Sequence, residues 1–215
     1  MPVHPAPPPG PAAVAAVAAV AAVAAVILAA GAGTRFGGPK ADAILPDGRR
    51  FLDAVLELAT SAGLRPIVAV IPPHVPVPAS ARSVVNPNPN TEQLASLRLG
   101  LAQLTNVPVS AAIVWPVDHP FVQLESLLAI LDAAQRTGAH IVIPTYENRR
   151  GHPTYFHRGS GRDLMTVAEG GARAVIHSGA HAVAEVMVQD AGVVQGINTR
   201  ADLGTVGEER GARGD

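Results

Sequence analysis

Short apolar runs alternate with helical patterns along most of this 215-residue chain, and that alternation constrains its fold more than any other feature. The continuous apolar character of buried strands marks residues 23–28, 66–71, 83–85, 111–117 and 140–143. Helical spacing marks residues 51–61, 93–104 and 124–136, with Gly138 ending the last. Strands that alternate with helices predict an α/β fold, a three-layer α/β/α sandwich around a mostly parallel sheet.

The alternation of strand and helix patterns changes after Thr145. Residues 147–151 are typical of a tight turn, and residues 154–157 of a returning strand. Two short helical pieces at residues 162–168 and 172–177, a strand at residues 183–188 and a segment around residues 196–203 close the chain. This order predicts a small antiparallel insertion beside the parallel half of the sheet.

Composition divides the chain into a leader at residues 1–22, a domain at residues 23–206 and a polar, glycine-rich tail at residues 207–215. The leader is proline-rich and then repeats Ala-Ala-Val, so we expect it to be disordered or frayed. By length alone, residues 12–30 also match a membrane span. Alanine contributes little transfer free energy, however, and no basic flank marks a signal peptide.

Charge and cysteine content exclude several classes of protein. A net charge of −1 gives no general attraction to nucleic acid or an anionic membrane. The absence of cysteine excludes disulfides, thiolate metal sites and a cysteine nucleophile. We therefore expect a cytoplasmic protein that binds neither nucleic acid nor membrane.

Lys40 is the only lysine, and it closes a glycine-rich run that begins where the first strand ends: Leu28-Ala29-Ala30-Gly31-Ala32-Gly33-Thr34-Arg35-Phe36-Gly37-Gly38-Pro39-Lys40. Glycine lets a backbone approach phosphate closely, and successive N–H groups bind anions. Arg35 offers a planar fork to phosphate oxygens, and Lys40 a compact charge. The run predicts a loop that holds a nucleoside triphosphate; the alternative is a flexible turn before a helix.

Other phosphate-binding motifs fit this loop poorly. In the P-loop motif Ser or Thr follows the lysine, whereas Ala41 follows Lys40 here. In the dinucleotide motif a third glycine would stand at position 36, which is Phe36.

Asp118 comes at the carboxyl end of a predicted buried strand, between Pro116 and Pro120. Ligands of open α/β sheets bind outside the carboxyl ends of the strands. A carboxylate there suits Mg²⁺, which takes protein oxygen together with substrate phosphates. The alternative is an aspartate that caps the next helix. We expect His119 beside it to pack or to support Asp118, and Trp115 to lie in the core.

Several motifs in order resemble the MobA-like nucleotidyltransferases, which include the molybdenum cofactor cytidylyl- and guanylyltransferases. The resemblance covers about residues 26–203 and rests first on the glycine loop. It rests also on Asn86-Pro87-Asn88 with Gln93 and Ser96-Leu97-Arg98, on Pro116-Val117-Asp118-His119-Pro120, on Gly151-His152-Pro153 with Gly171-Ala172-Arg173, and on Ile197-Asn198-Thr199. It implies a nucleotide-diphospho-sugar-transferase-like fold.

The resemblance also implies a set of site residues. The implied catalytic residues are Lys40, Arg35 and Asp118, with Asp118 and Asn198 holding Mg²⁺. The implied acceptor residues are His152 and Arg173. The alternatives are that His152 only shapes the turn before Pro153, that Arg173 is a solvated surface charge, and that Asn198 caps a turn or helix before Thr199. The implied nucleotide-binding residues are Leu28, Ala29, Ala30, Gly31, Gly33, Arg35, Gly37, Gly38, Lys40, Asn86, Gln93 and Ser96.

The implied reaction is transfer of a nucleoside monophosphate from an NTP to a phosphorylated acceptor, with molybdopterin the leading acceptor. Ala30 favours CTP, because Leu-Ala-Ala-Gly goes with cytidylyl transfer in the family and Leu-Ala-Gly-Gly with guanylyl transfer. A sugar 1-phosphate or a phosphorylated alcohol is an alternative acceptor. The closing motif departs from the family, which often has two aspartates where this chain has Gly196 and Asn198. A non-catalytic nucleotide-binding regulator therefore remains a second function to consider.

Overall fold

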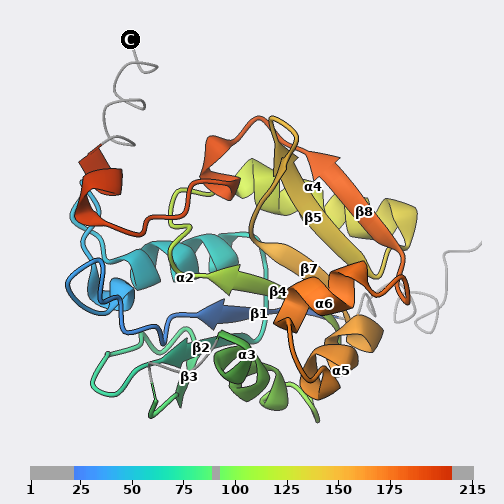
Figure 1. Ribbon diagram of the computed structural model, residues 1–215, viewed down its shortest axis with the longest axis horizontal. Coiled ribbons are helices and arrows are strands. Elements are labelled where there is room, and N and C mark those ends of the chain that lie inside the picture. The colour runs from blue at the N-terminus through green and yellow to red at the C-terminus, as the bar shows by residue number, and fades with distance from the viewer. Residues whose placement is uncertain (1–21, 89–92, 205–215) are drawn as a thin grey trace, which may run out of the picture.

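A mixed sheet organises the computed structural model, which describes residues 22–88 and 93–204 (Figure 1). Strand order is β3-β2-β1-β4-β7-β5-β6, and β8 also pairs with β5. The strands are β1 (Ala22–Leu28), β2 (Ile67–Ile71), β3 (Arg82–Val85), β4 (Val109–Pro116), β5 (Ile141–Tyr146), β6 (Arg149–Arg150), β7 (Thr154–His157) and β8 (Val183–Met187). The helices are η1 (Lys40–Asp42), α2 (Phe51–Ser61), α3 (Gln93–Ala102), α4 (Leu124–Thr137), α5 (Arg158–Thr166), α6 (Gly171–His177) and η2 (Ala191–Val193).

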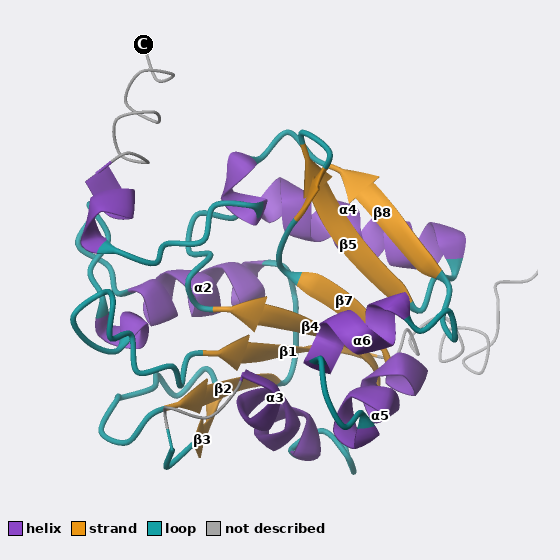
Figure 2. Ribbon diagram, viewed as in Figure 1, coloured by secondary structure: helices purple, strands orange, loops and turns teal. Residues whose placement is uncertain are grey.

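Side chains of β1 alternate between two hydrophobic cores, one on each face of the sheet. Ala25 and Ile27 pack with α2 and α4 on one face, and Val26 and Leu28 pack with α3, α5 and α6 on the other. Figure 2 shows the sheet between these two helical layers. Because both faces are covered, a strand such as β2 is buried at every position, which explains its continuous apolar sequence. The predicted three-layer α/β/α sandwich is confirmed.

The sheet is parallel through β3, β2, β1 and β4, and then changes direction. β7 lies antiparallel to both β4 and β5, whereas β8 runs parallel to β5. A tight hairpin joins β5 to β6 through Glu147 and Asn148, whose φ angles are 48° and 61°. Positive φ at both turn residues matches the twist of a two-residue hairpin. The predicted antiparallel insertion is therefore confirmed.

Element boundaries differ from the sequence prediction mainly in the second half. α5 begins at Arg158 rather than at residue 162, because the His157 ring accepts a hydrogen bond from the Gly159 N–H (3.3 Å) and caps the first turn. β5 continues past Pro144 to Tyr146, and the Pro144 carbonyl accepts a bond from Gly151 (2.8 Å). Both differences come from local bonds that hydrophobic periodicity does not encode.

The leader and tail predictions fall almost wholly outside the described residues, so the limits of the domain stay predictions. Within residues 22–88 and 93–204, no helix has the length and apolarity needed to cross a membrane.

Gly100 lets α3 approach the sheet closely. A Cβ there would lie 2.4 Å from Val26 Cγ1 and 3.0 Å from Val70 Cγ2. We expect overpacking in Gly100→Ala to lower the free energy of unfolding by about 1–3 kcal/mol. The higher helix propensity of alanine should offset about 0.5–1 kcal/mol of this loss. Urea unfolding measures the change. Gly161→Ala in α5 is the matched control, because nothing lies within 4 Å of its Cβ position, and it should be neutral or stabilising. Equal stability of the two variants would contradict the packing account.

Candidate active site

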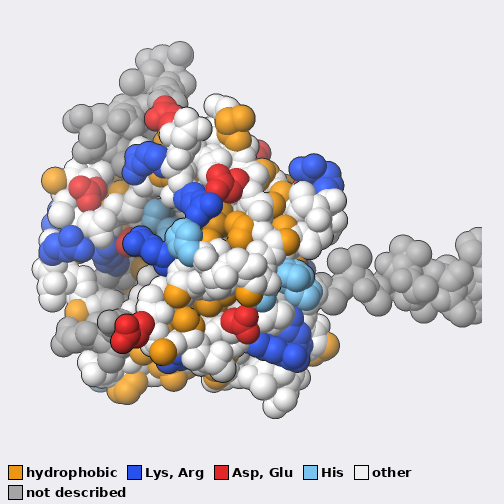
Figure 3. All heavy atoms as spheres, turned by 45° about the vertical axis from the view of Figure 1, so that its right-hand side comes forward, with side chains coloured by type: hydrophobic (Ala, Val, Ile, Leu, Met, Phe, Trp, Pro, Cys, Tyr) orange, Lys and Arg blue, Asp and Glu red, His pale blue; other side chains and the backbone are white. Residues whose placement is uncertain are grey.

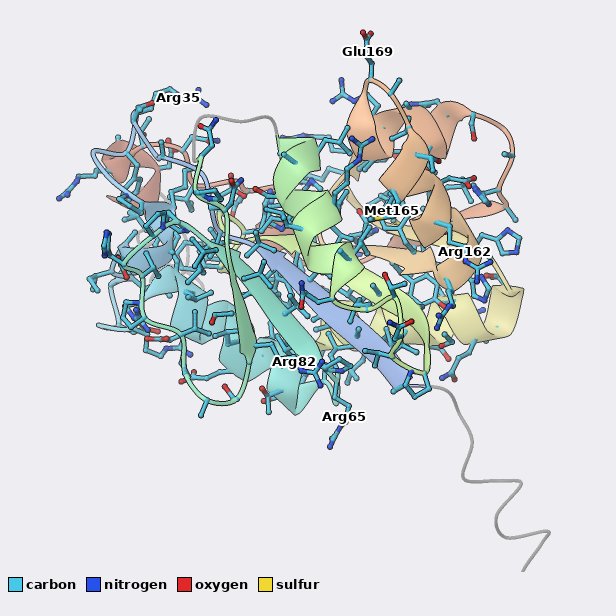
Figure 4. All side chains as sticks on the ribbon, turned by 90° about the horizontal axis from the view of Figure 1, so that it is seen from below. Arg35, Arg65, Arg82, Arg162, Met165 and Glu169 are labelled. Carbon is cyan, nitrogen blue, oxygen red and sulfur yellow. The ribbon has the colours of Figure 1, made fainter. Side chains whose placement is uncertain are left out.

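The glycine loop after β1 folds back on itself and is closed by one carbonyl. The N–H groups of Phe36, Gly37 and Gly38 all donate to the Gly33 carbonyl oxygen, at 2.8, 2.9 and 3.1 Å. Gly33 has φ of 60°, and a Cβ there would lie 1.9 Å from the Gly38 carbonyl oxygen. Only glycine fits, so the loop shape depends on this residue. Arg35 is exposed at the outer end of the loop (Figure 4).

Lys40, in the short helix η1, joins two distant segments. Its ammonium Nζ donates to Asp118 Oδ2 at 3.0 Å and to Asn198 Oδ1 at 2.8 Å. The Lys40 side chain is 16% exposed and that of Asp118 27%, so solvent screens the contact only in part. The single lysine, the strand-end aspartate and the closing asparagine therefore form one cluster.

The position of Asp118 follows from the register of β1 and β4. Leu28 pairs with Pro116 in the parallel ladder, and the Val117 N–H donates to the Leu28 carbonyl at 3.0 Å. The Asp118 carbonyl accepts from the Ile197 N–H at 2.8 Å, which fastens the closing segment beside it. Strand pairing thus brings the glycine loop and Asp118 to the same edge of the sheet.

Asn198 is oriented by its own neighbours. Its Nδ2 donates to the Gly196 carbonyl at 3.1 Å, which turns Oδ1 toward Lys40. Asp202 accepts from the N–H groups of Asn198 (2.7 Å) and Thr199 (2.8 Å), and these bonds hold the pKa of Asp202 below its usual value. Sequence analysis missed this role of Asp202; the Thr199-x-x-Asp202 spacing, similar to a capping box, was the available signal.

A cavity of about 340 Å³ opens above this cluster. Eleven of the predicted site residues line it, namely Leu28, Ala29, Ala30, Gly31, Gly33, Arg35, Lys40, Gln93, Ser96, Asp118 and Asn198. Asn86 lies behind the cavity, where its Nδ2 donates to Ser96 Oγ at 3.0 Å. Gly37 and Gly38 shape the loop without lining the cavity. A direct nucleotide contact by any of these residues stays a prediction.

A second cavity of about 550 Å³ adjoins the first, and the two share Leu28, Gln93 and Pro116 in their walls. Both predicted acceptor residues, His152 and Arg173, line it. The structure therefore places the two predicted substrate sites side by side.

His119 and His152 lie beneath the cluster with their ring centres 5.0 Å apart. His119 Nδ1 is 3.3 Å from the Gly192 carbonyl, so Nδ1 carries the proton and Nε2 faces Asp118 Oδ1 at 3.9 Å. Burial lowers the pKa of His119, and burial followed by the neighbouring His119 lowers the pKa of His152 to about 4. Both rings are therefore neutral at pH 7.

Asp190 supports this pair and was not anticipated. Its buried carboxylate accepts from the Gln123 N–H (2.8 Å), Ser126 Oγ (2.8 Å) and the Gly192 N–H (2.9 Å). These bonds fix the turn whose Gly192 carbonyl holds His119. One residue further, the Val193 carbonyl accepts from the His152 N–H at 2.7 Å.

The oxygen atoms of the cluster suit a hard divalent cation. Asp118 Oδ1 is buried and has no hydrogen-bond partner in the described part of the chain, while Asp118 Oδ2 and Asn198 Oδ1 already face a cation, the Lys40 ammonium. Residues 22–88 and 93–204 contain no group of three or more His, Cys, Asp or Glu side chains able to hold a metal by themselves. A cation here would depend on substrate oxygens and water, as Mg²⁺ commonly does.

A family model for the MobA-like NTP transferase domain matches residues 25–184. The chain belongs to this family. A comparison with curated proteins finds no significant match.

Solved structures of similar fold include nucleotidyltransferases. Rv0371c from Mycobacterium tuberculosis H37Rv is 25% identical with a TM-score of 0.73, covering 87% of this chain and 98% of that one. Its complex with manganese gives 24% identity, a TM-score of 0.62 and coverage of 78% and 88%. 2-C-methyl-D-erythritol 4-phosphate cytidylyltransferase from Thermus thermophilus is 18% identical with a TM-score of 0.67, covering 87% of this chain and 98% of that one. Molybdopterin-guanine dinucleotide biosynthesis protein A from Archaeoglobus fulgidus is 19% identical with a TM-score of 0.64, covering 88% of this chain and 98% of that one. This MobA-like chain thus has the predicted nucleotide-diphospho-sugar-transferase-like fold.

The neutral state of His152 makes stability depend on pH. Its pKa is about 4 in the folded chain, against about 6.5 when unfolded. Between these values the unfolded chain binds the proton and the folded chain does not, so stability falls as pH drops from about 6.5 to about 4, by up to about 3 kcal/mol. Urea unfolding at pH 7.5 and at pH 4.5 measures this change. The free energy of unfolding should fall less between the two pH values for His152→Gln than for the wild-type protein. The exposed His74→Gln is the control and should follow wild type. If His152→Gln loses as much free energy of unfolding as the wild-type protein, the lowered pKa assigned to His152 is contradicted.

Proposed function

We propose that this MobA-like protein transfers a nucleoside monophosphate, preferably CMP, from an NTP to the phosphate of a small-molecule acceptor, with release of pyrophosphate. The contact that carries the proposal is the bridge from Lys40 to Asp118 and Asn198, at the base of a cavity rimmed by the glycine loop. Its position beside a second cavity supports transfer between two substrates. We also propose that the protein acts in the cytoplasm, on small molecules rather than nucleic acid or membrane.

In the proposed reaction an oxygen of the acceptor phosphate attacks the α-phosphorus in line, a new P–O bond forms, and the bond to the pyrophosphate oxygen breaks. Arg35 and those N–H groups of the glycine loop that do not bond to the Gly33 carbonyl hold the β- and γ-phosphates. Lys40 neutralises charge that builds up near the α-phosphate. A phosphate monoester is already a nucleophile, so no side chain has to remove a proton. Catalysis then rests on positioning and charge.

A divalent cation fits the same cluster. We propose that Asp118 and Asn198 hold Mg²⁺, which when bound would neutralise phosphate charge and orient both substrates. The unpartnered Asp118 Oδ1 supports this assignment. The manganese complex of Rv0371c is a further support, because that protein has a similar fold.

The preference for CTP rests on Ala30, which is buried and lines the first cavity. Its methyl group narrows the space where a base would lie. Molybdopterin is the leading acceptor by family resemblance, and a sugar 1-phosphate or phosphorylated alcohol is the alternative.

Pyrophosphate release, measured for each NTP with a panel of phosphorylated acceptors, tests the proposal. We expect release only when an NTP and a phosphomonoester are both present, with CTP favoured over GTP. Ala30→Gly should relax that preference by roughly tenfold to two-hundredfold at most, as for one methyl group in a pocket. A wild-type preference for GTP would contradict the base assignment, and no release with any pair would contradict nucleotidyl transfer.

Replacing Lys40 tests the bridge. Lys40→Ala should lower turnover by on the order of 10²–10³, as for loss of one preorganised charge donor. Lys40→Arg should not restore full activity, because a planar guanidinium differs in size and geometry from an ammonium between two oxygens. Single-turnover rates at saturating NTP give the comparison. Arg82→Ala, on the exposed edge strand β3 (Figure 4), removes a charge that does not line the cavity and serves as the control. Full activity in Lys40→Ala would rule out the assignment.

A further inference from the structure

The second cavity differs in chemistry from the first. Its wall is mainly apolar and comes from α3, β4, β5, β7 and α6, through Leu94, Leu97, Val114, Ile143, Phe156 and Ile176. Among residues 22–88 and 93–204, no aspartate or glutamate lines it, and the hydrogen-bonding side chains other than histidine and arginine are Gln93 and Thr154. Figure 3 shows basic and histidine side chains gathered about a hollow in which hydrophobic side chains are visible.

Positive groups lie at the exposed margin of this apolar wall. Arg150 pairs with Glu185 at 2.6 Å, so much of its charge is already balanced. Arg173 has no ion pair within the described part of the chain, and its carbonyl accepts from His177 Nδ1 at 2.9 Å. The cavity therefore combines an apolar interior with one unbalanced cation at its edge.

Three residues, Leu28, Gln93 and Pro116, line both cavities and mark the boundary between them. Leu28 and Pro116 are paired positions of β1 and β4, and both line both cavities. A molecule in the second cavity reaches Asp118 and Lys40 only with the part that extends past this pair. A phosphate carried by such a molecule would lie at that end, and the rest of the molecule would lie against the apolar wall.

We propose that the acceptor is a phosphomonoester whose body is flat or otherwise apolar and carries few hydroxyl groups. This inference rests on the proposed function and makes its acceptor more specific. A sugar phosphate would bring several hydroxyl groups against leucine, isoleucine and phenylalanine side chains, which cannot replace the hydrogen bonds that those groups lose to water. An aromatic or alkyl body gains by leaving water for the same wall. Ile176 and Phe156 are then specificity-determining residues.

Calorimetric titration of the full chain with simple phosphomonoesters tests the acceptor class, in buffer with Mg²⁺ and without nucleotide. The probes are 1-naphthyl phosphate, glucose 1-phosphate and inorganic phosphate. We expect 1-naphthyl phosphate to bind at least tenfold more tightly than the other two. Equal or tighter binding of glucose 1-phosphate, or equal binding of inorganic phosphate, would overturn the proposal.

A matched pair of variants locates the binding. Ile176→Thr keeps the branched shape but places a hydroxyl in the wall, and should weaken 1-naphthyl phosphate about tenfold while leaving glucose 1-phosphate unchanged. Leu128→Thr makes the same kind of change at an exposed position of α4 outside the cavity, and should change neither affinity. An unchanged affinity of folded Ile176→Thr for 1-naphthyl phosphate would overturn the proposal; should that variant not fold, the wild-type comparison still decides.

Failure of the acceptor class can be told apart from failure of the proposed function. CTP is titrated into the same samples, and its binding depends on the first cavity alone. If CTP binds and 1-naphthyl phosphate shows no preference, only the acceptor inference is wrong. If CTP does not bind, the proposed nucleotidyl transfer is wrong, whatever the second cavity prefers.

Discussion

The Lys40 ammonium between Asp118 and Asn198 is the contact on which the rest of the site depends. A partly buried ammonium needs compensating oxygens, and these come from residues 78 and 158 positions further along the chain. Parallel pairing of β1 with β4 brings the glycine loop and Asp118 to one edge. The bond from Ile197 to the Asp118 carbonyl returns the closing segment to the same place. The fold thus collects three short segments around one charge.

The parallel and antiparallel halves of the sheet contribute to different proposed sites. The parallel half presents the glycine loop and the strand-end aspartate, which suit phosphate and a cation. The antiparallel half contributes Phe156 of β7 and Ile143 of β5 to the apolar wall of the second cavity. Leu28 and Pro116, on the parallel strands β1 and β4, line both cavities. The first cavity therefore lies at the carboxyl ends of the parallel strands β1 and β4, and the second extends toward β7 and β5.

Much of this arrangement could be predicted because strands and their carboxyl ends leave strong local signals. The run ending at Leu28 and the strand before Asp118 are apolar throughout, and parallel strands place their ends at one edge. Other features depend on partners distant in sequence. Asn86 supports Ser96, Asp190 bonds to Gln123 and Ser126, and the His119–His152 pair forms only when β4 and the turn before β7 meet. No periodicity encodes such contacts, so only the structure could supply them.

Binding of Mn²⁺, a paramagnetic stand-in for Mg²⁺, tests the central claim most directly, because it reports on the cluster without requiring the acceptor. Electron paramagnetic resonance titration in the presence of CTP should show one bound ion in the wild-type protein. Asp118→Asn should weaken that binding by tenfold or more, since it removes the only carboxylate of the proposed pair, while the fold and its melting temperature persist. Unchanged Mn²⁺ affinity in Asp118→Asn would contradict the claim that this cluster is the phosphate- and cation-binding centre of the protein.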